Sequence, residues 1–386
     1  MSKLRSIWLV FFTGFLCISG CGDEEPEEML DEMVEEQALD ERLQEIVNSK
    51  VGANQLVGVF VSIRVGREER WNLVGGLSDG ASPITSDMRF GIGSITKTVV
   101  AATIMKLQEK GLLDIGDPIG DHLTLESPYV SDSITIFQLL NHFTGLHGYF
   151  RHPDIWPQVE ENLEEAIVPT DLVDFIQEPF FLPGERFEYS NSNYLVLGLV
   201  IESVTGKTVG EVMREEFWGP LNLTETYFGS NEPIQGSIAA PWRDTDGDGQ
   251  LENIADQFGP AYHSVFYTAA DVFTTASDLS LWAQELFNGN ALTDESQEAM
   301  VDFVTLGDPI FTGYGLGIRE VFVLERTLWG HTGGMRGYGS FMFYDPVSEV
   351  SIALLNNQSR SINGPELRGE LFFELLEAVF EELENT

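Results

Sequence analysis

Gly91-Ile-Gly-Ser94-Ile-Thr-Lys97 leads directly into the apolar run Val99-Val-Ala-Ala-Thr-Ile-Met105, which is followed by Lys110-Gly111. The run is apolar on nearly every helical face, which predicts a buried helix with Ser94 at its N-terminus and a glycine C-cap. Taken alone, Ser94 has the ordinary interpretation of an N-cap, whose hydroxyl serves only an unpaired backbone N–H group.

Lys97 changes this interpretation, because side chains three residues apart lie on the same face of a helix. Burial lowers the pKa of a lysine, and the neutral amine can then accept the serine proton. The helix N-terminus also favours the negative charge that develops on the serine oxygen. The spacing therefore makes Ser94 a candidate nucleophile and Lys97 a candidate base.

S-x-x-K at the start of a buried helix resembles the first motif of the serine β-lactamases and penicillin-binding proteins. Phe181-Leu-Pro-Gly-Glu-Arg-Phe-Glu-Tyr189-Ser190-Asn191 supplies Y-S-N, similar to the second motif of the class C branch. Trp329-Gly-His331-Thr332-Gly333-Gly334 supplies H-T-G in place of the β-lactamase K-T-G, just before a predicted strand. The chain resembles this family over about residues 40 to 380.

The resemblance implies a role for each motif. Tyr189 would exchange a proton with the Ser94 oxygen and then with the leaving group, and a phenol between cations can have a lowered pKa. Asn191 would hold Lys97 and the substrate amide, and the backbone N–H groups of Ser94 and Gly334 would form the oxyanion hole. The covalent intermediate would be an acyl-enzyme. The substrate-binding and oxyanion candidates are Asn191, His331, Thr332, Gly333 and Gly334.

His331 limits what the substrate can be. The matching lysine of the β-lactamases is a permanent cation that helps to hold the substrate carboxylate, whereas a histidine is mostly neutral near pH 7. Carboxylate recognition is therefore weakened or moved elsewhere, and Arg336 either restores the positive charge or points to solvent. Related D-alanyl-D-alanine carboxypeptidases and some esterases carry H-T-G. The resemblance thus implies such a peptidase or an esterase, with a β-lactamase as the alternative.

A catalytically silent lipoprotein that binds peptidoglycan or a partner is the competing hypothesis from another class. The motifs argue against it, because a binding protein does not require Ser94, Lys97 and Tyr189 together. No H-E-x-x-H metalloprotease motif occurs. We expect a small-molecule or peptidoglycan-type substrate and no required cofactor, and the oligomeric state is left open.

The patterns outside the motifs predict an α+β fold. Apolar or β-branched runs at 57–65 and 70–75 predict a hairpin, and similar runs predict strands at 313–320, 321–328, 339–344 and 350–356. An amphipathic helix is predicted over 365–382. We expect one antiparallel sheet built from both chain ends with flanking helices and an inserted helical subdomain. The sheet part would cover about residues 39–93 and 310–386, and the helical part about 94–309.

The N-terminus has the pattern of a targeting signal. Lys3 and Arg5 precede a nearly all-apolar run from Ile7 to Ile18, which is too short to span a membrane comfortably. Ile18-Ser19-Gly20-Cys21 resembles the bacterial lipoprotein processing box, in which the cysteine is lipidated. Residues 1–20 would then be a lipoprotein signal peptide and 21–38 an acidic tether, giving an envelope protein anchored in the membrane. The alternative is an ordinary secretory signal with a chance cysteine.

Composition excludes one class of partner. The chain of 386 residues is 43% apolar, enough for a sizeable core, and its 21 basic and 62 acidic side chains give a net charge of −41. The negative electrostatic potential of so acidic a surface repels nucleic acid. Within the acidic excess, Asp244-Thr-Asp246-Gly-Asp248-Gly249 matches the first half of an EF-hand-like loop, although position twelve is Ala255. The loop is therefore either a structural calcium site or a simple acidic turn.

Overall fold

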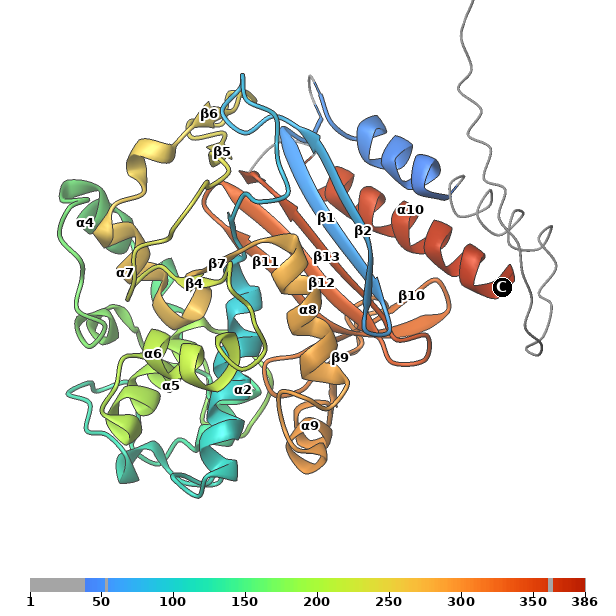
Figure 1. Ribbon diagram of the computed structural model, residues 1–386. Helices are drawn as coiled ribbons and strands as arrows, with labels where there is room; N and C mark the ends of the chain where they lie inside the picture. The colour runs from blue at the N-terminus through green and yellow to red at the C-terminus, as the bar shows by residue number, and fades with distance from the viewer. Residues whose placement is uncertain (1–38, 53–54, 360–363, 386) are drawn as a thin grey trace, which may run out of the picture.

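An eight-stranded antiparallel sheet forms the centre of the computed structural model, which describes residues 39–52, 55–359 and 364–385 (Figure 1). Its strand order is β2-β1-β13-β12-β11-β10-β9-β8. The N-terminal side of the chain supplies β1 (Gly58–Val65) and β2 (Glu68–Gly76). The C-terminal side supplies β8 (Val304–Thr305), β9 (Gly313–Tyr314), β10 (Arg319–Val323), β11 (Arg326–Met335), β12 (Tyr338–Asp345) and β13 (Val350–Asn356).

The two ends of the chain meet where β1 pairs with β13. Val59 lies opposite Asn356 and Val65 opposite Val350, in an antiparallel register without interruption. Every side chain of β13 is buried, because both faces of the sheet are covered. The predicted sheet from both chain ends is therefore confirmed.

Two helices cover the outer face of the sheet (Figure 1). One spans residues 39–49, and the other is α10 (Gly364–Asn385), slightly longer than the amphipathic helix that its pattern predicts. Leu43 and Leu375 are fully buried and share one hydrophobic cluster with Val61 of β1. This layer stabilises the sheet from the side away from the catalytic motifs.

The other face packs against α8 (Ala276–Phe287) and, beyond it, the helical part. Ser62 Oγ lies 2.9 Å from Ser280 Oγ, and Ser351 Oγ donates to the Ser280 carbonyl, so α8 is bonded directly to β1 and β13. The expected boundaries placed α8 within the helical part, whereas it forms the inner cover of the sheet.

The helical part is built around α2, α5 and α7, which pack against one another. Its helices are α2 (Thr96–Glu109), α3 (Ile136–Leu140), α4 (Ile155–Glu161), α5 (Asn191–Thr205), α6 (Val209–Met213), α7 (Pro260–Ala270) and α9 (Asp294–Met300). Single turns lie at Gly93–Ile95, Ile119–Asp121, Tyr149–Arg151, Asp171–Phe175, Arg214–Trp218 and Ala255–Gln257. No helix of the described residues is long and apolar enough to cross a membrane.

Two small sheets connect the parts. One has the order β3-β7-β4, formed by Phe90–Gly91, Val272–Thr274 and Tyr227–Phe228. The other has the order β14-β5-β6, formed by Gln358–Ser359, Trp242–Arg243 and Glu252–Asn253. The first of them delivers the chain to Ser94, because β3 ends at Gly91.

The strand that carries H-T-G begins later than its pattern predicts. Leu324 and Glu325 both have positive φ and form the turn between β10 and β11, so the predicted strand over 321–328 is wrong. The motif lies within β11, just before β12, the strand that the pattern over 339–344 predicts. A two-residue turn that reverses the chain at 324–325 leaves no glycine or proline signal, which explains the error.

Candidate active site

Ser94 lies in the single turn Gly93–Ile95, immediately before α2. Its hydroxyl caps neither this turn nor the helix, so the interpretation of Ser94 as an N-cap is wrong. Gly93 has φ +54°, and a Cβ atom there would come within 2.5 Å of the Gly334 nitrogen. Glycine is required at this position because the turn passes directly against β11.

Lys97 is completely buried, and its amine reaches three oxygen atoms. The Nζ atom lies 2.9 Å from Asn191 Oδ1, 2.7 Å from the Ala269 carbonyl and 3.2 Å from Ser94 Oγ. The first two oxygens can only accept hydrogen bonds. A neutral amine has two N–H groups for them, which leaves its lone pair directed at the serine hydroxyl.

Burial lowers the pKa of Lys97 well below its usual range, and the nearby Arg319 guanidinium lowers it further. Both effects disfavour an ammonium at this position. The neutral form is the one that can take a proton from Ser94. Geometry and electrostatics therefore agree on the direction of proton transfer.

Tyr189 directly precedes α5, whose N-cap is Ser190 and whose first residue is Asn191. Its ring centroid is 5.1 Å from Lys97 Nζ, and its buried hydroxyl has no hydrogen-bond partner among the described residues. Burial raises the pKa of Tyr189 to about 12, although the positive charge of Arg319 opposes the shift. The expectation of a lowered pKa is wrong, because desolvation of the phenolate outweighs the nearby cation.

Strand β11 closes the site opposite Lys97. A Cβ atom on Gly333 would overlap the Ile92 carbonyl oxygen, so the strand packs tightly on the turn that carries Ser94. Gly334 is exposed, and open space lies where its side chain would be. The backbones of Ser94 and Gly334 are thus close neighbours, with room for a ligand above Gly334, and the half-buried Thr332 lies beside them.

His331 is buried and neutral. Burial lowers its pKa well below the usual range, and Arg319 and Lys97 lower it further. Its Nδ1 atom lies 2.6 Å from the Thr332 carbonyl, which can only accept a hydrogen bond. This residue therefore supplies no positive charge to the site.

Arg319 on β10 is a functional candidate that sequence reasoning missed. Its guanidinium carbon lies 5.2 Å from the Tyr189 ring centroid, and its buried Nε atom makes no hydrogen bond. Within the described residues no carboxylate pairs with it. Arg336, the cation that the sequence offered instead, binds Glu160 at 3.1 Å and lies over the Trp156 ring. An arginine on a strand without a motif around it gives no sequence signal of this role.

The three aspartates of the candidate calcium loop do come together. Ligand oxygens of Asp244, Asp246 and Asp248 all lie within 4.8 Å of one another, in the loop between β5 and β6. Asp244 accepts hydrogen bonds from the backbone N–H groups of Gly247 and Gly249. These contacts form an acidic turn, and the alternative of a structural calcium site is untested.

A second serine lies in a pattern that is typical of other hydrolases. Gly76-Leu-Ser78-Asp-Gly80 matches the letters of a G-x-S-x-G nucleophile elbow, which requires a strand, a sharp turn and a helix. Ser78 follows β2 but no helix follows it, and its buried hydroxyl accepts a hydrogen bond from the Ala240 N–H group. The residue is structural.

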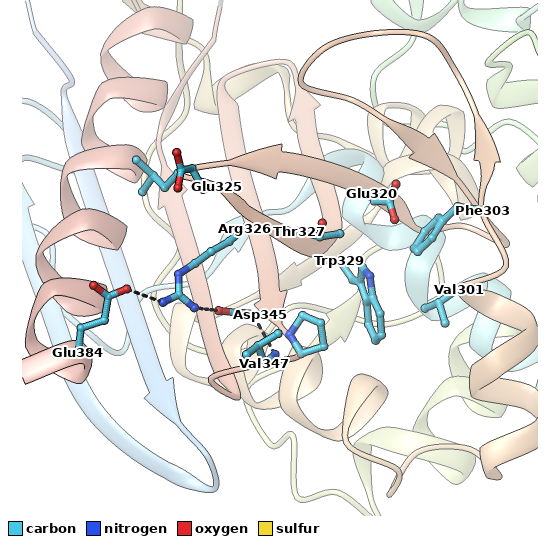
Figure 2. A pocket seen from close by; sticks show the side chains of 12 residues that line it. Val301, Phe303, Glu320, Glu325, Arg326, Thr327, Trp329, Asp345, Val347 and Glu384 are labelled. Atoms are coloured by element: carbon cyan, nitrogen blue, oxygen red, sulfur yellow. Dashed lines mark hydrogen bonds and ion pairs between the residues drawn. The ribbon is translucent and has the colours of Figure 1, made fainter. Parts of the chain in front are cut away.

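A cavity of about 700 Å³ lies at the far end of β10 and β11. Figure 2 shows Arg326 on its wall, bound on one side to Asp345 and on the other to Glu384. The cation is therefore already neutralised. None of the catalytic candidates lines this cavity, and Cys21 lies outside the described residues.

A model of the beta-lactamase family matches residues 37–374. Penicillin-binding protein 4* of Bacillus subtilis (strain 168) is 26% identical over 275 residues, which cover 67% of this chain and 58% of that protein. The putative penicillin-binding protein PbpX of the same organism is 26% identical over 283 residues, covering 72% and 63%. The chain thus spans little more than half the length of these relatives.

Solved structures agree on the fold. The D-stereospecific amidohydrolase from a Streptomyces species superimposes with a TM-score of 0.75 at 26% identity, covering 86% of this chain and 97% of that one. The D-amino acid amidase from Ochrobactrum anthropi SV3 superimposes with a TM-score of 0.78 at 24% identity, and the match covers 89% of this chain and 99% of that one. The α+β fold predicted from the strand and helix patterns of the sequence is confirmed. The chain belongs to the beta-lactamase family.

Proposed function

We propose that this chain is a serine hydrolase, a carboxypeptidase-like peptidase that forms an acyl-enzyme on Ser94. The observation that carries the proposal is the buried Lys97 amine, whose two acceptors leave its lone pair for the Ser94 hydroxyl 3.2 Å away. Burying an amine away from water costs stability. A catalytic role explains why the chain keeps Lys97 in this position, whereas a binding protein would have no use for it.

In the proposed first step, Ser94 Oγ attacks the substrate carbonyl while its proton passes to Lys97. The carbonyl oxygen becomes negative and accepts hydrogen bonds from the N–H groups of Ser94 and Gly334. The C–N bond then breaks as Tyr189, which is protonated at neutral pH, gives its proton to the leaving nitrogen and recovers one from the Lys97 ammonium. Water then hydrolyses the ester and regenerates Ser94.

The charge of the site supports a substrate that carries a carboxylate on the leaving-group side. His331 is neutral, whereas Arg319 is a cation with no carboxylate partner among the described residues. Positive charge is therefore present but comes from β10 and not from the H-T-G motif. A peptide with a free C-terminus, such as one ending in D-alanyl-D-alanine, fits this charge. Two similar proteins are named as penicillin-binding proteins and one as a D-stereospecific amidohydrolase, which is consistent with the proposal.

The first experiment measures hydrolysis by residues 22–386 of a peptide ending in D-alanyl-D-alanine, its C-terminal amide, a nitrophenyl ester and a β-lactam. Ser94→Ala is the control for each. We expect peptide cleavage that disappears in the variant. Ester cleavage alone would support an esterase, and β-lactam turnover a β-lactamase. A penicillin adduct on Ser94 without turnover of any substrate would support the silent binding protein.

Arg319→Met tests the substrate class separately. We expect KM for the free-acid peptide to rise by about tenfold or more, since a hydrogen bond to a charged group contributes roughly 1.5–3 kcal/mol. KM for the matching C-terminal amide should change little. Equal changes in KM for the free-acid peptide and for the amide would show that Arg319 does not bind the substrate carboxylate. The assignment of Ser94 as the nucleophile would not be affected.

A further inference from the structure

A continuous series of hydrogen bonds crosses the site behind Tyr189. The Ser190 N–H group lies 3.2 Å from His142 Nδ1, and His142 Nε2 lies 3.1 Å from the Tyr314 hydroxyl. The Tyr314 hydroxyl lies 3.3 Å from His331 Nε2, and His331 Nδ1 lies 2.6 Å from the Thr332 carbonyl. The series joins the Y-S-N loop to the H-T-G strand through side chains that are all buried.

Only one arrangement of protons satisfies this series. The Ser190 N–H group can only donate, so His142 Nδ1 is bare and Nε2 carries the hydrogen that Tyr314 accepts. At the other end the Thr332 carbonyl can only accept, so His331 Nδ1 carries its hydrogen and Nε2 is bare. Tyr314 then donates to His331. Every link is satisfied with two neutral imidazoles of opposite tautomer.

His142 also fixes the chain on both sides of Tyr189. Its carbonyl accepts a hydrogen bond from the Glu188 N–H group, and its Nδ1 atom accepts one from Ser190. Its ring lies against the Tyr189 ring with centroids 4.3 Å apart. The residue adopts a positive φ of 64°, a conformation that costs energy for a side chain other than glycine or asparagine.

The surroundings of the two imidazoles contain basic side chains but no carboxylate partner. Lys97 from α2 and Arg319 from β10 act on both rings, and Tyr189, Tyr194 and Tyr314 contact His142. Among the described residues no acidic side chain hydrogen-bonds to His142 or His331. A proton on either ring would add a positive charge beside the Arg319 guanidinium and the Lys97 amine, and it would break a link of the series.

We propose that His142 and Tyr314 are positioning residues, which hold Tyr189 in place and keep His331 neutral in its Nδ1–H tautomer. The inference rests on the proposed role of Tyr189 as the proton donor. It also gives the H-T-G motif a physical reason in this chain. A lysine at position 331 could accept no hydrogen bond from Tyr314, because an ammonium has donors only.

The direct test is ¹⁵N NMR of the histidine side chains in the wild-type protein, with resonances assigned by single His→Gln variants. We expect His142 as the Nε2–H tautomer, His331 as the Nδ1–H tautomer, and no titration of either between pH 5 and 8. A protonated ring in that range, or an Nε2–H tautomer at His331, would overturn the inference. This measurement needs no substrate, so it is independent of the proposed activity.

The kinetic test compares Tyr314→Phe with Tyr338→Phe. Tyr338 is also buried, and its hydroxyl donates to the Ala239 carbonyl, but it lies outside the series. We expect Tyr314→Phe to lower kcat by about 3- to 10-fold with little change in KM, the scale of one lost hydrogen bond. In a plot of kcat against pH, the fall of activity on the acid side should begin at a higher pH in Tyr314→Phe than in the wild type. The reason is that His331 loses the hydrogen-bond donor that favours its neutral form. If both variants keep the wild-type pH profile, Tyr314 is merely structural.

Discussion

At the scale of single residues, two ionisable groups with opposite tasks lie side by side. Burial lowers the pKa of Lys97 and raises that of Tyr189 to about 12, because in each case it disfavours the charged form. The same physical cause thus favours a neutral base at Lys97 and extends the pH range over which the Tyr189 phenol stays protonated. Each group is in the form that its proposed step requires.

Tyr189→Phe should separate activity from stability. We expect kcat for peptide to fall by about 10²–10⁴, the usual contribution of a positioned proton donor. The melting temperature should stay the same or rise, because the lost hydroxyl is buried without a partner. Tyr149→Phe is the matched control, since the Tyr149 hydroxyl donates to the Val265 carbonyl at 2.7 Å. The control should lose stability and keep its activity. A drop in melting temperature for Tyr189→Phe would contradict the prediction.

The motif residues could be predicted from sequence because short spacings fix them. The separation of three residues brings Lys97 to Ser94, and Asn191 follows Tyr189 by two residues at the start of a helix. Arg319, Tyr314 and the role of His142 could not be predicted. They reach the site only through strand register and the packing of one part on the other, for which a single sequence carries no local signal.

At the scale of elements, the junction of α7 and β7 holds the catalytic lysine. The Ala269 carbonyl accepts from Lys97, and the Val272 N–H group donates to Thr96 Oγ1. Between them the buried Asp271 binds His263 at 2.9 Å and Ser230 at 2.6 Å. The ion pair therefore fixes a segment on which the position of Lys97 depends.

Stability should fall as this ion pair loses its proton. Burial lowers the pKa of His263, but Asp271 outweighs burial and the pKa is raised from its usual 6.5. A raised pKa contributes stability that is fully present below pH 6.5 and is lost as pH rises through the folded-state value. We expect the difference in unfolding free energy between wild type and His263→Gln to shrink above pH 6.5. Urea unfolding at several pH values measures it, and a constant difference would contradict the assignment.

The β5–β6 loop should behave as a turn and not as a strong calcium site. Its carboxylates already accept backbone hydrogen bonds, and Ala255 supplies no bidentate ligand at position twelve. We expect calcium to leave the melting temperature of chelator-treated protein unchanged. Asp244→Asn is the control for the turn itself. A calcium-dependent rise in wild type that is absent from this variant would establish a metal site instead.

At the scale of the whole molecule, the site depends on both ends of the chain. The turn with Ser94 and the strand with Gly334 come from distant segments, which the pairing of β1 with β13 and the packing of β11 on Ile92 bring together. The sheet could be predicted because strand patterns occur at both termini. The position of α8 could not be predicted. Its sequence pattern indicates a helix but does not indicate which face of the sheet that helix covers.

The last prediction concerns where the folded domain is held. The prediction rests on Cys21, which the sequence places in a lipoprotein-like processing box and which lies outside the described residues. We expect wild-type protein expressed in a bacterium to sediment with membranes and to carry a lipid mass on Cys21. Cys21→Ala should move it to the soluble fraction with unchanged kcat, because every catalytic candidate lies between residues 94 and 334. Equal distribution of both proteins between the fractions would reject the anchor, while an unmodified Cys21 in membrane-bound protein would require another attachment.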